Sequence, residues 1–479
     1  MLAGKMKRKE FVRLTGMLAA GALVSPEALF SQSTAADFPI VRVPLSKRKF
    51  TSEAVEKTIK AFSQKIDNKE LAWLFQNCFP NTLDTTVDFE IINGKPDTYV
   101  ITGDIDAMWL RDSTAQVWPY LSLIKEDKKL QQLIAGVINR QVKNILLDPY
   151  ANAFYKDPAK ISEWKDDATD MKPGIHERKW EIDSLCYPVR LAYHYWIQSG
   201  DATVFDAQWR KAAGLIVKTF KEQQRKKSKG PYKFERRTSW ATDGVPLGGY
   251  GYPAKPVGLI HSMFRPSDDA TIFPFLIPSN FFAVVSLQQM SQLADKVYKD
   301  ADFAKECADL ASEVQAALQE HAIVNHPKFG NVYAYEVNGY GSYNLMDDAN
   351  VPSLLSLPYL GAVSNTDPIY ITTRKLLLSD YNPFFFKGKA GEGIGGPHAG
   401  TDLIWPLSII IRALTSNDDD EIKKCVAILQ KSHAGTGFMH ETFHKDEVSK
   451  FTRSWFAWAN TIFGELLHTL YDNKPQLLS

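Results

Sequence analysis

The stretch 454–467, SWFAWANTIFGELL, places apolar residues on every face of a predicted helix, with Glu465 as its single charged residue. The stretch before it, 418–432 (DDDEIKKCVAILQKS), has one charged face and one apolar face. A helix that is apolar all round is buried, whereas a helix with a charged face lies on a surface. The two segments therefore predict an outer helix followed along the chain by an inner one.

The same alternation runs along the whole chain. The charged amphipathic segments are 53–66, 128–147, 201–224, 300–322, 366–378 and 418–432. The nearly apolar segments begin near Ser113, Asp183, Asn280, Pro352, Thr401 and Ser454. Six inner helices surrounded by six outer ones form an (α/α)6 toroid. We therefore expect an all-α fold in a single domain, 37–479, although a length of 479 residues alone would favour two or three domains.

Long loops precede the inner helices. All inner helices of such a toroid run the same way, so the loops that enter them meet at one rim. These loops are 80–112, 225–279, 323–351, 379–400 and 433–453. Loops of this length are uncommon unless they are functional. In the stretch 84–104, β-branched and apolar residues alternate with polar ones on both sides of Asn93-Gly94. This pattern predicts a β-hairpin, which we expect to lie over the rim.

The charge balance excludes one class of partner. The chain has 56 basic and 55 acidic residues, so it lacks the basic excess that nucleic-acid binding requires. Aromatic residues make up 12% of the chain. They fit a large core or a carbohydrate site, because sugar faces stack on aromatic rings, and composition alone leaves both open.

The N-terminus predicts export. Basic residues around Arg8 precede an apolar stretch, Leu14–Val24, and then small and polar residues up to Ala36. This pattern is typical of a signal peptide, and the apolar stretch is too short for a membrane span of about 20 residues. Arg8-Lys9 also resembles a twin-arginine signal. We expect 1–36 to be removed, with no membrane span, and the mature protein to be periplasmic or secreted.

The four cysteines, Cys78, Cys186, Cys307 and Cys425, are far apart and form no CxxC pair. Zinc-ribbon and redox motifs therefore have no support. Two disulfides or four buried free thiols both remain open.

Two motifs carry carboxylates in rim loops. The stretch 264–270, FRPSDDA, places Asp268 and Asp269 near Arg265, which suits a general acid whose pKa depends on its neighbours. Glu441 lies in a second loop, 433–453. Hydrolysis of a glycosidic bond needs an acid that protonates the leaving oxygen and a second carboxylate. The two groups stand ~6.5–9.5 Å apart in inverting enzymes and ~5–5.5 Å apart in retaining ones.

The stretch 103–112, GDIDAMWLRD, concentrates Trp109, Arg111 and Asp112 just before an apolar helix. Helix capping accounts for one acidic residue there, but not for this set. Weaker candidates are Glu181 and Asp183, which open another apolar helix. Glu392, His398 and Thr401 lie in the glycine-rich stretch GEGIGGPHAGTD, which has no parallel-strand context for a nucleotide.

His440-Glu441-Thr442-Phe443-His444 also matches H-E-x-x-H, the zinc-peptidase motif. Both histidines bind one metal only on a regular helix, and the glycines and charges around this stretch argue against a helix. The best third ligand would be Glu465.

Taken together, these motifs resemble glycoside hydrolase family 125, the metal-independent exo-α-1,6-mannosidases. The ordered matches are TGDIDAMWLRDS, WEIDSLCYP, FRPSDDA with IPSNFFA, GGPHAGTDLIWPLS, and GFMHETFH with FTRSWFAWANTIFGEL, spanning 102–466. The resemblance implies an (α/α)6 fold, inversion at the anomeric carbon, no metal or other cofactor, and removal of a non-reducing terminal α-1,6-linked mannose.

Carried onto this sequence, the resemblance makes Asp268 the acid and Glu441 the base. The residues that hold the sugar hydroxyls would be Trp109, Arg111, Asp112, Asp183, Arg265 and His398. The substrate would be a mannose-containing oligosaccharide from an N-glycan or a mannan. The alternatives are another (α/α)6 glycosidase with a different sugar or linkage preference, a zinc peptidase, and a catalytically silent glycan-binding protein.

Overall fold

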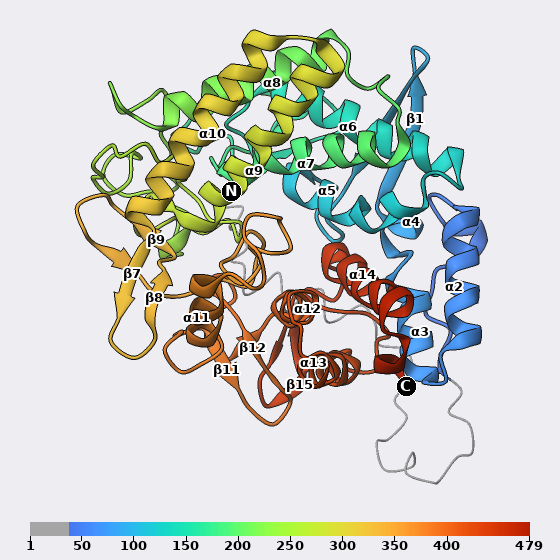
Figure 1. The fold of residues 1–479 in the computed structure, drawn as a ribbon. Helices are drawn as coiled ribbons and strands as arrows, with labels where there is room; N and C mark the ends of the chain where they lie inside the picture. Colours follow the sequence, from blue (N-terminus) through green and yellow to red (C-terminus); the bar gives the residue numbers. More distant parts are fainter. Residues whose placement is uncertain (1–37) are drawn as a thin grey trace, which may run out of the picture. The chain divides into compact units, whose positions relative to one another are not determined.

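The computed structural model describes residues 38–479. The expected signal peptide, 1–36, lies outside the described residues. Six amphipathic helices lie on the outside of the unit Val41–Ser479, each close to its expected position (Figure 1). They are α2 (Glu53–Lys65), α6 (Lys128–Leu147), α8 (Ala207–Gln223), α10 (Ala301–His321), α11 (Pro368–Leu377) and α13 (Asp419–Ser432).

Each outer helix begins with a local capping signal. Its N-cap residue is an aspartate or, in α2, a serine, whose side chain accepts backbone N–H groups of the first turn. These residues are Ser52, Asp127, Asp206, Asp300, Asp367 and Asp418. Such caps stabilise a helix start by about 0.5–2 kcal/mol. The starts of the outer helices are therefore encoded next to the helices themselves.

Five inner helices begin without a side-chain cap. They are α5 (Leu110–Val117), α7 (Ile182–Ser199), α9 (Ile277–Leu293), α12 (Pro406–Leu414) and α14 (Ala457–Asn473). Strands of two residues enter three of them: β3 (Met108–Trp109), β6 (Phe275–Leu276) and β13 (Leu403–Ile404) lead to α5, α9 and α12. Tertiary structure around the rim, rather than capping, therefore sets where these helices begin.

The expected inner helix beginning near Pro352 is wrong, because residues 351–361 form consecutive turns and bends. Two prolines interrupt this short segment, and proline cannot donate a helical N–H. The buried Asp347 carboxylate instead accepts the backbone N–H groups of Leu354 at 2.8 Å and Leu355 at 3.0 Å. The backbone thus finds partners without forming a helix.

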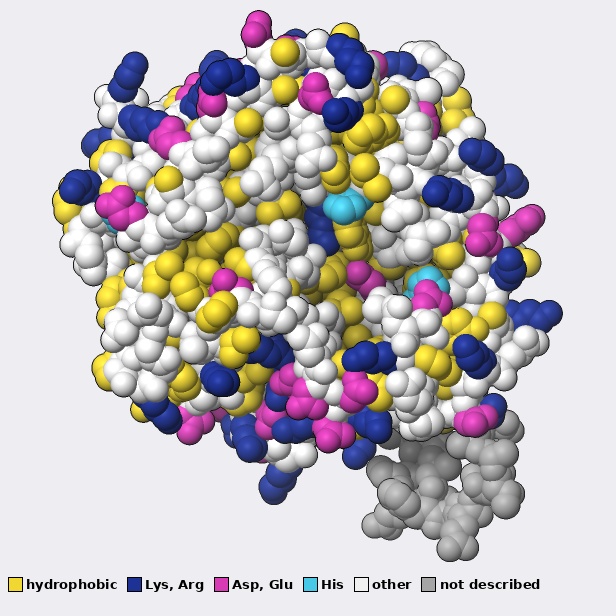
Figure 2. All heavy atoms as spheres, in the orientation of Figure 1, with side chains coloured by type: hydrophobic (Ala, Val, Ile, Leu, Met, Phe, Trp, Pro, Cys, Tyr) yellow, Lys and Arg dark blue, Asp and Glu magenta, His cyan; other side chains and the backbone are white. Residues whose placement is uncertain are grey.

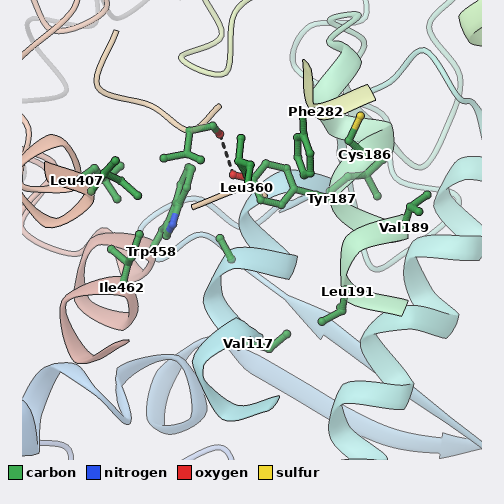
Figure 3. Packing of buried hydrophobic residues seen from close by; sticks show 14 of the residues in the cluster. Val117, Cys186, Tyr187, Val189, Leu191, Phe282, Leu360, Leu407, Trp458 and Ile462 are labelled. Atoms are coloured by element: carbon green, nitrogen blue, oxygen red, sulfur yellow. Dashed lines mark hydrogen bonds between the residues drawn. The ribbon is translucent and has the colours of Figure 1, made fainter. Parts of the chain in front are cut away.

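All six inner segments nevertheless meet in the centre (Figure 3). Buried side chains from each of them are Val117, Tyr187, Phe282, Leu360, Leu407 and Trp458. The Tyr187 hydroxyl donates a hydrogen bond to the Val351 carbonyl at 2.8 Å, and its ring packs edge-on against Phe282 with centroids 5.1 Å apart. The non-helical segment therefore occupies the place of the sixth inner helix.

The hairpin forms as expected, from β1 (Val87–Ile92) and β2 (Lys95–Val100), with positive φ at both Asn93 and Gly94. Its expected position over the rim is wrong. The hairpin packs along α6, where the Asp97 carboxylate pairs with Arg140 and Lys143. One edge of the hairpin contacts the segment 153–156, where the Tyr99 hydroxyl donates to the Phe154 carbonyl at 3.2 Å and Lys156 pairs with Asp88 at 2.6 Å.

The remaining elements are short. Helices α3 (Lys69–Cys78) and α4 (Asn81–Thr85) follow α2. The other strands are β4 (Ala153–Phe154), β5 (Ile175–Glu177), β7 (Ile323–His326), β8 (Gly330–Tyr333), β9 (Glu336–Val337), β10 (Tyr343–Asn344), β11 (Phe385–Lys387), β12 (Glu392–Ile394), β14 (Thr442–His444) and β15 (Glu447–Thr452). The fold is thus mostly helical with small sheets, rather than purely helical.

Two further features bear on the sequence predictions. All four cysteines are buried free thiols, so the disulfide alternative is wrong. Within residues 38–479, no helix combines the length and the apolar character that crossing a membrane requires. The face seen in Figure 2 is hollowed near its centre, where basic, acidic and histidine side chains lie among apolar ones.

Alanine substitutions at two helical glycines test how closely the hairpin packs on α6; Gly136 faces the hairpin and Gly214 does not. A Cβ atom at Gly136 of α6 would lie 2.9 Å from the Thr98 backbone nitrogen, whereas at Gly214 of α8 the nearest atom is the flexible Arg210 Nη1, at 3.4 Å. We expect Gly136→Ala to lower the free energy of unfolding by about 1–3 kcal/mol. Gly214→Ala should leave it unchanged or raise it by up to about 1 kcal/mol, because alanine favours helices. Thermal unfolding of the two variants checks this, and equal effects would contradict the close approach.

Candidate active site

The site is built around Arg111, in the first turn of α5. This side chain is only 3% exposed. Its Nη1 donates to Glu181 Oε2 at 2.6 Å and to Asp183 Oδ2 at 3.0 Å, and its Nη2 donates to Asp268 Oδ1 at 3.2 Å. Its Nε lies 3.6 Å from Asp112 Oδ2. One buried guanidinium therefore faces four carboxylates, which come from α5, the start of α7 and the loop before α9.

The backbone at Asp268 has a left-handed conformation, with φ of 65°. For a non-glycine residue this conformation costs roughly 1–2 kcal/mol, so the surroundings must hold it. The Lys179 ammonium donates to the Asp268 carbonyl at 2.8 Å, and the Asn152 amide donates to Asp268 Oδ1 at 3.1 Å. The Asp268 side chain stays 22% exposed. Its carboxylate is therefore fixed in place yet open to a ligand.

The adjacent Asp269 has different partners. Its side chain is 2% exposed, and its Oδ1 accepts from the Thr242 hydroxyl at 2.8 Å and lies 3.4 Å from His398 Nδ1. Burial acts to raise the pKa of Asp269, but His398, Thr242 and Lys179 together outweigh burial and lower the pKa of the carboxyl. The strained turn thus directs two adjacent carboxylates to two different sets of groups. Asp268 is the one that joins Arg111.

Glu441 lies just before β14. Its backbone N–H donates to the Thr452 carbonyl at 3.3 Å, so the chain here runs beside β15. The Thr452 hydroxyl donates to Glu441 Oε2 at 2.8 Å, and Arg453 Nη1 donates to Oε1 at 3.4 Å. The same Arg453 side chain binds Asp104 through Nε at 2.9 Å. Both oxygens of Glu441 are therefore oriented by neighbours on one side.

Asp112 connects the two halves of the site. Burial raises the pKa of this carboxyl to about 6; the Arg111 and Arg453 charges lower it and the Asp268 charge raises it. Asp112 is therefore close enough to sense both Asp268 and the arginine that holds Glu441. The two expected catalytic carboxylates, Asp268 and Glu441, are each held by an arginine that acts on Asp112.

The other expected sugar-binding residues differ in their surroundings. Trp109 is 6% exposed and packs edge-on against His176, and its indole N–H has no hydrogen-bond partner among residues 38–479. Asp183 is fully buried beside Arg111. The Arg265 guanidinium instead forms an ion pair with Glu336 at 2.7 Å. That pair anchors the loop of Asp268 to β9.

The zinc-peptidase geometry is absent. The H-E-x-x-H stretch forms strand β14 and the residues before it, not a helix. The His440 ring stacks on Phe451, and Glu465 accepts from the Trp118 indole at 3.1 Å and the Tyr359 hydroxyl at 3.0 Å. Within residues 38–479, no group of three or more His, Cys, Asp or Glu residues could hold a metal ion.

Three residues of the site, Asn152, Lys179 and Arg453, were not predicted from the sequence. Lys179 directly precedes the motif WEIDSLC, and Arg453 lies inside the stretch FTRSW, so adjacency to a motif was an available signal for both. Asn152 lies outside every motif. Only the tertiary structure brings it to Asp268.

Comparison with known proteins identifies the family. A model described as metal-independent alpha-mannosidase (GH125) matches residues 68–468. The chain belongs to this family. A related protein of Schizosaccharomyces pombe, the Meiotically up-regulated gene 157 protein, is 43% identical over 458 residues, which cover 92% of this chain and 90% of the relative.

Two solved structures are also similar. A Streptococcus pneumoniae metal-independent alpha mannosidase, in a non-productive complex with alpha-1,6-mannobiose, is 39% identical with a TM-score of 0.85. The match covers 89% of this chain and 100% of that one. A glucoamylase from Saccharomycopsis fibuligera shares the fold alone, at 13% identity and a TM-score of 0.50, over 91% of this chain and 99% of that one.

The protein is therefore a metal-independent α-mannosidase with an α/α barrel-type fold, as the sequence motifs predicted. Membership of a hydrolase family excludes the silent binding protein, and the strand at His444 excludes the peptidase geometry.

Arg453 tests how Glu441 is held. A lysine ammonium cannot reproduce the fork that binds Glu441 and Asp104 together. We expect Arg453→Lys to lower kcat/KM by about 100-fold, since small misplacements of a catalytic group have effects of this size. Steady-state kinetics on a mannoside checks it.

Arg412 provides the matched control. It also bridges two carboxylates, Glu392 at 2.9 Å and Glu421 at 2.7 Å, but it has no contact with the Arg111 network. Arg412→Lys should leave kcat/KM within about twofold, as expected for a residue outside the reacting groups. Similar losses in both variants would mean that the Arg453 effect is not specific to Glu441.

Proposed function

We propose that this α-mannosidase removes a non-reducing terminal α-1,6-linked mannose, one residue at a time, and inverts the anomeric carbon. Family membership supports the reaction class, and the alpha-1,6-mannobiose in the Streptococcus pneumoniae relative supports the linkage. The single observation that carries the proposal is the placement of Asp268 on Arg111 and of Glu441 on Arg453, with the Asp112 carboxyl under the influence of both arginines.

Asp268 is the general acid in this proposal. The motif FRPSDDA assigns it by resemblance, and two features of its surroundings support the assignment. Its carboxylate is the partly exposed member of an otherwise buried cluster. Its backbone is held in a strained conformation by Lys179, as is common for residues whose orientation matters to function. The acid would protonate the glycosidic oxygen as the C1–O bond breaks.

Glu441 is the general base. It activates a water molecule that attacks C1 from the opposite face of the sugar ring. Hydrogen bonds from Thr452 and Arg453 hold its carboxylate in a fixed orientation.

The remaining expected residues fit sugar recognition to different degrees. Arg111, Asp112 and Asp183 offer charged groups at the start of inner helices, and His398 stands beside Asp269. The unpaired indole N–H of Trp109 is a donor suited to a hydroxyl. Arg265 would act through the loop that it anchors.

The N-terminal pattern supports export from a bacterial cell to the periplasm or the outside. Such an enzyme would meet mannose-containing oligosaccharides from N-glycans or mannans, and 37–479 would be its single (α/α)6 catalytic domain.

The stereochemistry tests the proposal directly. Proton NMR of α-1,6-mannobiose hydrolysis in the presence of EDTA should show β-mannose first, with α-mannose appearing later by mutarotation. Mannobioses with α-1,2 or α-1,3 linkages serve as controls and should react much more slowly. Initial release of the α-anomer would contradict inversion, and loss of activity with EDTA would contradict a metal-free reaction.

Variants of the two carboxylates test their roles. Asp268→Asn and Glu441→Gln should each lower kcat by about 10²–10⁴-fold, the range of general acid–base catalysis, while mannobiose still binds. Asp269→Asn is the matched control for the acid, because it changes the adjacent carboxyl. We expect it to lose less activity than Asp268→Asn in kinetic assays, and the reverse order would make Asp269 the acid.

A further inference from the structure

Glu181 is a fully buried carboxyl group with no role in the reaction described so far. It is the N-cap residue of α7, but its side chain accepts no backbone N–H from that helix. Its Oε2 accepts instead from Arg111 at 2.6 Å and from the Ser184 hydroxyl at 2.7 Å. Helix capping therefore does not explain why a carboxyl group is buried at this position.

The geometry brings Glu181 against Asp268. The Asn152 side-chain nitrogen lies 3.1 Å from Asp268 Oδ1 and 3.5 Å from Glu181 Oε1, and the two terminal nitrogens of Arg111 divide between the same two carboxyls. Arg111 and Asn152 therefore bridge the two carboxyl groups. Two ionised carboxylates held against the same donors repel each other, which favours one proton on the pair.

The charged groups around the pair determine how firmly that proton is held. Those that act on Glu181 or Asp268 from α5, α7 and the loops are Arg111, Asp112, His176, Glu177, Lys179, Asp183 and His398. Burial, with Asp268 and Asp183 nearby, raises the pKa of Glu181 well above its usual range despite Arg111. Burial also acts to raise the pKa of Asp268, but Arg111, Glu181, Lys179 and His398 together outweigh it, so the pKa of that carboxyl is lowered. These opposite shifts favour a shared proton on Glu181 rather than on Asp268.

We propose that Glu181 is a positioning residue that stores, next to Asp268, the proton that Asp268 delivers to the leaving oxygen. This inference rests on the proposed role of Asp268 as the acid. The proton moves from Glu181 to Asp268 and then to the glycosidic oxygen as the C1–O bond breaks and its electron pair stays on that oxygen. The pair is left doubly ionised between Arg111 and Lys179. It regains a proton from solvent, while the proton that the base took from water returns to solvent.

The pH dependence of kcat/KM for α-1,6-mannobiose tests the proposal, because it reports the essential acid of the free enzyme. The native enzyme loses activity at high pH as the pair loses its shared proton. In Glu181→Gln the amide donates to Asp268 and favours its ionised form. We therefore expect the alkaline limb to move to lower pH by about one unit or more, with a loss of about tenfold or more at neutral pH.

Asp183→Asn is the matched control. Asp183 is equally buried, lies two residues further along α7 and accepts from the same Arg111 nitrogen, at 3.0 Å, but Asn152 bridges Glu181, and not Asp183, to Asp268. In Asp183→Asn the alkaline limb of the kcat/KM profile should move by less than half of the shift expected for Glu181→Gln, even if the substitution changes KM. Equal shifts in the two variants would show that only charge near Arg111 matters, and would overturn the proposal.

A second substrate separates proton delivery from a structural role. The leaving group of 2,4-dinitrophenyl α-mannoside departs without protonation, so Glu181→Gln should be nearly as fast as the native enzyme on it. Equal losses on both substrates would overturn proton storage. If Asp268→Asn keeps its activity on mannobiose, the proposed acid itself is wrong. If that variant is inactive while Glu181→Gln leaves the alkaline limb in place, only the present inference fails.

Discussion

The buried Arg111 guanidinium is the charge on which the rest of the site depends. A buried charge is tolerated only when it is paired and hydrogen bonded, and removing one partner of such a group typically costs about 3–5 kcal/mol. Arg111 is surrounded by Glu181, Asp183, Asp268 and Asp112, so the starts of α5 and α7 and the loop before α9 must all be in place to satisfy it. The assembly of the rim and the assembly of the site are the same event.

The local charge balance explains why protons stay in this site. One guanidinium cannot compensate four carboxylates, and the further cations, Lys179 and Arg453, pair mainly with Asp243 and with Asp104 and Glu441. The first turns of α5 and α7 add partial positive charge from their uncapped N–H groups, which favours the ionised forms of Asp112 and Asp183. Burial outweighs these positive charges and raises the pKa of Asp112 and the pKa of Glu181.

Local sequence encodes the outer layer of this fold better than the inner one. Each outer helix has its own cap and charged face, so all six were predicted close to their true bounds. The inner segment at Pro352 was predicted as a helix from its apolar composition. Its backbone is satisfied by Asp347, a residue outside the segment, and no periodicity reports such a partner. The hairpin at Asn93-Gly94 was predicted from its turn, but its docking on α6 depends on the small size of Gly136, on another element.

In the candidate site, too, contacts that form only in the tertiary structure could not be predicted from local sequence. Motifs near the starts of inner helices identify Arg111, Asp183 and the Asp268-Asp269 pair, because such positions point to one rim. Which of two adjacent aspartates joins Arg111 depends on a single φ angle, and Lys179 holds that angle through a backbone carbonyl. A side chain that donates a hydrogen bond to a backbone carbonyl cannot be recognised from a sequence motif, because every residue has the same carbonyl acceptor. The strain at Asp268 and the cation that sustains it are therefore properties of the folded rim. The chemistry of the acid depends on them as directly as on the aspartate itself.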